Sequence, residues 1–109
     1  MITAKEINDI NKIVCDSEDN TLGNKDCSSC LSSYFYYETI EEQIASIVNS
    51  IIKNHCFVDG NKRTALAVLY KLCKDNNVKL NNKDKANIIN EMASKKMDIS
   101  QVVELLFHW

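Results

Sequence analysis

Apolar residues recur every three to four positions along much of the chain, a spacing that places them on one face of an α-helix. The pattern predicts helices at residues 3–16, 39–54, 61–75, 82–94 and from residue 98 onward. It is strongest in the second of these segments, where one wide apolar face is expected to lie at the centre of a core. The members of that face are Ile40, Ile44, Ile47, Val48, Ile51 and Ile52.

Capping residues stand at the starts of these segments. Two pairs have the Thr-x-x-Glu spacing of a capping box, in which each side chain bonds the other residue's backbone N–H. They are Thr3 with Glu6 and Thr39 with Glu42. Asn82 is the expected cap of the fourth helix, and Asp98, followed by Gln101 three residues later, is the expected cap of the last.

The chain between the first two predicted helices lacks the helical period. Residues 17–27 are polar and rich in turn formers, which predicts a loop around Gly23. Residues 28–38 include four consecutive aromatic residues at positions 34–37, which favour an extended segment or a short exposed β-hairpin flap over a helix. An alternative is that some of these rings cover the core.

The composition favours a single soluble globular domain of the all-α class over residues 1–109. The 109 residues are 45% hydrophobic and 26% charged, and they include two glycines and no proline, so residues for β-turns are scarce. The sequence has no apolar run long enough to span a membrane, and its first residues contain no signal-peptide core, so a cytoplasmic location is expected. A net charge of −2 argues against a nucleic-acid binder or a membrane-surface protein.

Five cysteines in a chain without a secretion signal predict reduced thiols. Cys27 and Cys30 have the CxxC spacing of some metal and redox sites. A zinc site needs a second pair of ligands, and a redox motif is expected beside a βαβ unit, which the pattern does not provide. Loop or buried thiols are therefore the favoured interpretation.

Ionisable and polar side chains suited to chemistry are concentrated in residues 55–66, HCFVDGNKRTAL, which lead from the end of one predicted helix into the next. Lys62 and Arg63 fall in the first turn of the latter helix, where backbone N–H groups are unpaired and the helix dipole is positive. Cations are unfavourable there unless an anion is bound. This arrangement predicts a phosphate site in which Lys62 gives a point charge and Arg63 a bidentate fork.

The neighbouring residues complete a set suited to phosphoryl or nucleotidyl transfer. Phe57 is the expected apolar anchor of the loop, and Gly60 allows a positive φ or a close backbone approach. Asn61 is expected to cap the helix or shape the turn. Asp59 beside the cations indicates a bridging Mg²⁺, and His55 is suited to accept a proton from a hydroxyl.

Each of these residues taken singly is more often structural: a lone histidine is commonly packed, an aspartate near a helix start commonly caps it, and a Lys-Arg pair is commonly solvated. Their concentration in one loop favours the functional interpretation. No GxxxxGK[ST] motif is present, so the site is not a P-loop.

At these residues the sequence resembles the Fic/Doc family, whose motif reads HxFx[D/N]GN[G/K]R. The matching positions are His55, Phe57, Asp59, Gly60, Asn61 and Arg63. The resemblance implies a helical Fic/Doc-type bundle with a hairpin flap near residues 28–38. It also implies that His55 is the general base, that Asp59 holds Mg²⁺, and that the phosphates of ATP lie in a nest of Gly60, Asn61, Lys62 and Arg63.

Two positions direct the resemblance toward the death-on-curing (Doc) branch. Adenylylating members have Gly where this chain has Lys62 and a second Arg where it has Leu66. Resemblance to the Doc branch implies a toxin that transfers the γ-phosphate of ATP to a threonine of elongation factor Tu and stops translation. Gly60, in contrast, is more typical of the Fic branch than the Ala of some Doc toxins, so protein adenylylation is the first alternative, and a catalytically inactive binding module is the second.

Regulation is also implied by the resemblance. Many Fic proteins carry an inhibitory helix with the motif [S/T]xxxE[G/N]. Ser100 and Glu104 have that spacing, but Leu105 follows, so the motif is incomplete. A toxin of this kind implies a separate antitoxin acting in trans.

Overall fold

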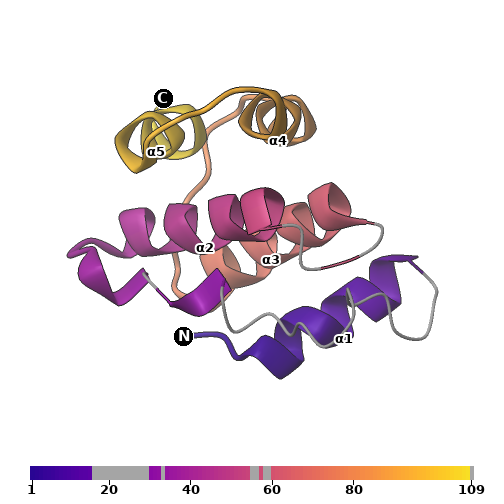
Figure 1. Cartoon of the computed structure of the whole chain (residues 1–109). Coiled ribbons are helices and arrows are strands. Elements are labelled where there is room, and N and C mark those ends of the chain that lie inside the picture. The colour runs from indigo at the N-terminus through magenta and orange to yellow at the C-terminus, as the bar shows by residue number, and fades with distance from the viewer. Residues whose placement is uncertain (16–29, 33, 55–56, 58–59, 109) are drawn as a thin grey trace.

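The computed structural model describes residues 1–15, 30–32, 34–54, 57 and 60–108, and its regular elements are helical (Figure 1). They are α1 (Ala4–Cys15), the 3₁₀ helix η2 (Tyr34–Tyr36), α2 (Ile40–Asn54), α3 (Asn61–Asp75), α4 (Lys85–Ser94) and α5 (Ile99–Phe107). The described residues contain no β-strand. The predicted all-α class is therefore confirmed, and the helix bounds agree with the sequence pattern to within a few residues.

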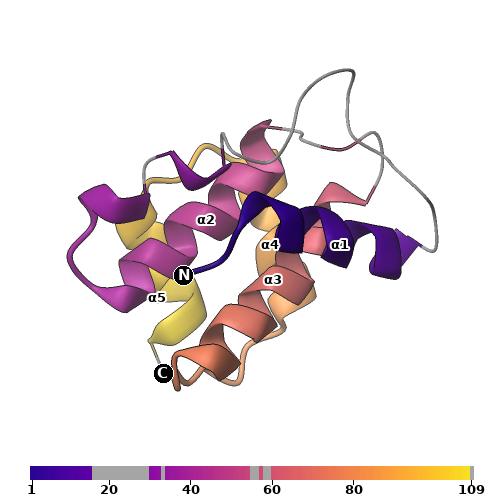
Figure 2. The same cartoon turned by 90° about the horizontal axis from the view of Figure 1, so that it is seen from below.

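The helices form three layers (Figure 1). The adjacent helices α2 and α3 make the middle layer, α1 packs against α3 on one side, and α4 and α5 cover the other side. Figure 2 views the molecule from the side of α1, with α4 and α5 partly hidden behind the middle layer. Residues 55–60 join the two middle helices, so the motif connects the two central elements of the fold.

The middle layer supplies most of the core, as its apolar pattern predicts. The predicted face of α2 is buried from Ile44 to Ile52, and Ile40 packs against its edge. The inward residues of α3 are Ala65, Val68, Leu69, Leu72 and Cys73. Burial of aliphatic side chains on this scale is the main force that holds both helices in place.

Three of the predicted caps are confirmed. The hydroxyl oxygens of Thr3 and Thr39 each accept from the backbone N–H of the glutamate three residues later. The carboxylate of each glutamate accepts in return from the backbone N–H of its threonine. Asp98 forms the same reciprocal pair with Gln101. The predicted Asn82 cap is wrong: Asp84 caps α4, because its carboxylate accepts from the N–H groups of Ala86 and Asn87 at 3.0 and 3.4 Å.

The expected hairpin flap is also wrong for the described part of residues 28–38. Tyr34–Tyr36 form a 3₁₀ turn in which the N–H of Tyr37 donates to the carbonyl of Tyr34 at 3.1 Å. A ladder needs a paired strand, whereas these backbone groups bond within the turn and to α2, since Gln43 Nε2 donates to the Tyr37 carbonyl at 2.9 Å. Tyr34 packs against the core, while Phe35 and Tyr36 are exposed.

This turn lies at the end of α2 that is away from the motif. It lies against the first turns of α2, whereas the motif follows the last turn (Figure 1). A helix of 15 residues is roughly 22 Å long, so the described aromatic residues lie far from the start of α3. The predicted loop at residues 17–27 lies outside the described residues.

A buried polar group joins the C-terminal helices. Lys85 is 5% exposed, and its ammonium donates to the carbonyl and the side-chain oxygen of Asn81 at 2.6 and 2.8 Å. Asn81 Nδ2 in turn donates to the carbonyls of Leu105 and His108 at the end of α5. Burial lowers the pKa of Lys85, and the carbonyl and amide oxygens compensate for the water that the ammonium has lost.

Two cysteines fit the interpretation as buried thiols. Cys30 and Cys73 are both buried, and burial raises the pKa of the Cys73 thiol to about 11, so this group is protonated at neutral pH. Cys27 lies outside the described residues. Within the described ranges no three metal-ligating side chains gather, and no helix there is both long and apolar enough to cross a bilayer.

Candidate active site at the start of α3

Four of the predicted site residues, Gly60, Asn61, Lys62 and Arg63, lie together where the motif enters α3. We call residues 60–63 the α3 start. Phe57 is also described and is 1% exposed, which confirms it as the buried anchor of the loop. The predicted base His55 and the predicted metal ligand Asp59 lie outside the described residues.

Asn61 closes the turn that leads into α3. Its side-chain oxygen accepts from the N–H of Phe57 at 3.1 Å, and its side-chain nitrogen donates to the carbonyl of Phe57 at 2.9 Å. Gly60, not Asn61, occupies the N-cap position of the helix. Of the two roles expected for Asn61, shaping the turn is the one that its side chain performs.

Gly60 is required at its position for two reasons. Its φ of 78° lies in the left-handed region, which a side chain disfavours. A Cβ added there would also lie 2.1 Å from Sγ of Cys15 in α1. The backbone at the α3 start is thus fixed both by its own turn and by direct contact with α1.

The electrostatics of the α3 start favour a bound anion. Its first turn has no acidic residue, Lys62 and Arg63 are exposed, and no side chain among the described residues caps the free N–H groups. The Arg63 guanidinium donates through Nη1 to the carbonyl of Val14 at 3.2 Å, in the last turn of α1. A carbonyl at a helix C-terminus is a favourable partner for a cation, so α1 holds the side chain of Arg63 at the α3 start.

Sequence reasoning missed the buried polar pair behind this turn. Asn11 Nδ2 donates to the hydroxyl of Thr64 at 2.9 Å, and both residues are 0% exposed. The same amide nitrogen lies 3.7 Å from Sγ of Cys15. The available signal was an asparagine four residues after Ile7, on the apolar face of the first helix.

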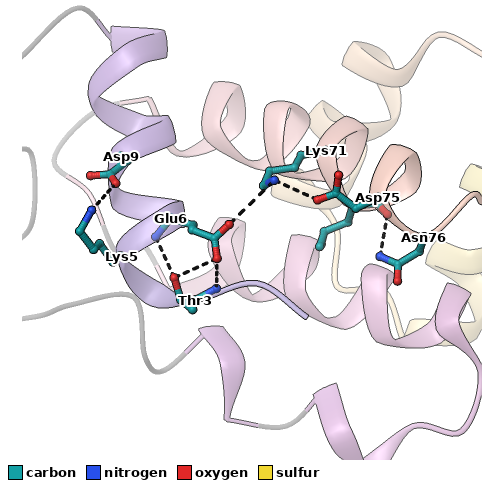
Figure 3. Close-up of polar contacts among 8 residues, drawn as sticks. Thr3, Lys5, Glu6, Asp9, Lys71, Asp75 and Asn76 are labelled. Atoms are coloured by element: carbon teal, nitrogen blue, oxygen red, sulfur yellow. Dashed lines mark hydrogen bonds and ion pairs between the residues drawn. The ribbon is translucent and has the colours of Figure 1, made fainter.

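The other end of the α1–α3 contact is held by exposed charges (Figure 3). Lys71 Nζ lies 2.9 Å from the carboxylate of Asp75 on its own helix and 3.8 Å from that of Glu6 in α1. Exposed ion pairs of this kind contribute little to stability because water and salt screen them. The exposed ion pairs at this end are therefore weaker than the buried bond between Asn11 and Thr64, and they lie farther from the motif.

Replacing Asn61 by alanine is expected to lower the free energy of unfolding by about 1–3 kcal/mol, because it leaves two backbone groups of Phe57 without their partner. Urea denaturation measures the change. Asn76→Ala is the matched control, since Asn76 donates one bond to the Leu72 carbonyl from an exposed position at the other end of α3. Equal losses in the two variants would contradict a specific role for Asn61 in closing the turn.

Comparison with known proteins places these observations in a family. The family model described as Fic/DOC family matches residues 2–73, a range that includes α1, α2, the motif and nearly all of α3. The protein named Toxin Doc from Mycolicibacterium smegmatis is 33% identical over 70 residues, which cover 61% of this chain and 54% of that protein. The chain thus spans about half the length of this curated relative. No solved structure matches the chain.

Proposed function

The chain belongs to the Fic/DOC family, and from that premise we propose that it is a Doc-type toxin acting as a protein kinase. In this proposal it transfers the γ-phosphate of ATP to a Ser or Thr hydroxyl of a translation factor, with elongation factor Tu as the expected target. The observation that carries the proposal is the α3 start, where Lys62 and Arg63 are exposed in a first turn that contains no acidic residue and whose N–H groups no side chain of the described residues caps.

The proposed reaction needs few groups. His55 accepts the proton of the target hydroxyl as its oxygen attacks the γ-phosphorus. The bond from that phosphorus to the oxygen bridging the β- and γ-phosphates breaks, and ADP leaves with that oxygen. The N–H groups of residues 61–63 and the side chains of Lys62 and Arg63 are suited to bind the phosphate oxygens and to stabilise their charge.

Mg²⁺ belongs to the proposal through Asp59, whose carboxylate is the oxygen donor that this ion prefers. When bound, the ion neutralises charge on the phosphates. The described residues fit the phosphate part of the co-substrate, because Lys62 and Arg63 are exposed and the first turn is uncapped by side chains of the described residues.

The structure also removes one argument for adenylylation. Gly60 resembles the Fic branch, but its φ of 78° and its contact with Cys15 explain the glycine without reference to the reaction. Lys62, in contrast, is exposed, so its presence where the adenylylating branch has Gly is better explained by a ligand than by burial in the core. Both points favour phosphate transfer.

Incubation with ATP labelled at the α or the γ position, together with purified elongation factor Tu or a bacterial lysate, tests the proposal. We expect protein labelling from the γ position alone. Labelling from the α position would identify an adenylyltransferase instead. No labelling from either position, together with no inhibition of bacterial growth, would support an inactive binding module.

We also propose that a separate antitoxin controls the protein in trans and that both act in the cytoplasm. Support for the pairing comes from the relative named Toxin Doc. Co-expression with the protein encoded by the adjacent reading frame is expected to restore the growth of cells that express this chain.

A further inference from the structure

We propose that Asn11 is a positioning residue for the α3 start, acting through its buried hydrogen bond to Thr64. The inference rests on the proposed function in one respect, namely that the α3 start binds phosphate. It concerns a residue far from the motif in sequence, since Asn11 and Thr64 are 53 positions apart.

The first step in the argument is that the contact is buried and specific. Both side chains are 0% exposed and the bond measures 2.9 Å. A buried hydroxyl that loses its partner cannot turn to water instead, so the bond favours one arrangement of the two helices over others.

The second step is the location of Thr64 relative to the candidate site. Its N–H donates to the carbonyl of Gly60 at 2.8 Å and so closes the first turn of α3. The three N–H groups proposed to bind phosphate belong to the residues enclosed by that bond. Fixing Thr64 against α1 therefore fixes the origin of the phosphate-binding turn.

The third step is that α1 leaves this turn little freedom to shift. The C-terminal part of α1 contacts it at three points: Asn11 at Thr64, Cys15 at Gly60, and the Val14 carbonyl at Arg63. A carbon atom added at Gly60 would lie 2.1 Å from Sγ of Cys15, so one of the two would have to shift. A shift of α3 along α1 must disturb all three contacts at once.

Four variants separate positioning from general stability. Thr64→Val keeps the shape of the side chain but removes the hydroxyl, and Asn11→Ala removes the other partner. Thr64→Ser keeps the hydroxyl and is the conservative rescue. Lys71→Met is the matched control, because it breaks the contact between the same two helices at the end away from the motif (Figure 3).

Two measurements are made on each variant. Hydrogen exchange of the ligand-free protein reports the opening of the Thr64 amide, and calorimetric titration with ATP and Mg²⁺ reports affinity. For Thr64→Val and Asn11→Ala we expect about tenfold faster exchange at Thr64 and about tenfold weaker ATP binding. Thr64→Ser and Lys71→Met are expected to remain within about twofold of the wild type in ATP affinity.

Several results would overturn the inference. They are wild-type ATP affinity in Thr64→Val, an equal loss of affinity in Lys71→Met, or faster exchange spread evenly along α3. If the wild-type protein binds no ATP, the proposed function fails, and exchange alone decides the positioning role. Faster exchange confined to the first turn of α3 would then sustain it, and uniform exchange would reject it.

Discussion

Replacing His55 by alanine is expected to slow γ-phosphate transfer about a thousandfold and to abolish growth inhibition in a bacterial host. The reason is that His55 is the proposed proton acceptor for the target hydroxyl, and a positioned general base typically contributes 10²–10⁴-fold to a rate. Initial rates with labelled ATP and elongation factor Tu measure the loss.

The chain provides a matched control for this experiment. His108, at the end of α5, is its other histidine, and its side chain is exposed. His108→Ala keeps the backbone carbonyl that accepts from Asn81 and is expected to leave the rate unchanged. Unchanged growth inhibition by the His55→Ala protein would contradict the catalytic account.

Replacing Gly60 by alanine is expected to lower the free energy of unfolding by about 2–5 kcal/mol, the largest change in stability expected for any residue of the α3 start. About 1–2 kcal/mol comes from holding a side chain at positive φ. A further 1–3 kcal/mol or so comes from the overlap of the new Cβ with Sγ of Cys15. Urea denaturation measures the sum.

A double variant separates the two parts. Cys15→Ala removes the sulfur atom, and the remaining Cβ at position 15 lies at an ordinary contact distance of 3.9 Å from the added carbon. Gly60→Ala in the Cys15→Ala background is therefore expected to cost only the part due to φ, about 1–2 kcal/mol. A cost as large as in the wild-type background would show that contact with α1 does not constrain the turn.

Much of the fold follows from local sequence signals. The helix bounds, the two threonine capping boxes and the Asp98 cap depend on residues three or four positions apart. Such contacts are local, so they form however the rest of the chain packs. The motif could also be identified from the sequence, because its residues lie close together in the chain at a fixed spacing. Its assignment to the family is confirmed, whereas the catalytic role of His55 and the metal role of Asp59 stay predictions.

The errors have a common cause. Residues 34–37 have high strand propensity, but that propensity is realised only when a partner strand is available, and here the backbone bonds within a turn and to α2. Asn82 is as suitable a cap as Asp84 by type, so the choice between them depended on where the chain crosses to α4. In both cases the surroundings, not the residue, decided the outcome.

The sequence by itself determined the helices, their apolar faces and the chemistry concentrated in residues 55–66, because each of these depends on neighbours in the chain. The tertiary structure alone decided what holds the α3 start in place. Asn11 meets Thr64, and Cys15 meets Gly60, only because α1 packs against α3. Contacts between residues some 50 positions apart leave no periodic signal in a single sequence. They can be identified only once the packing of the two helices is known.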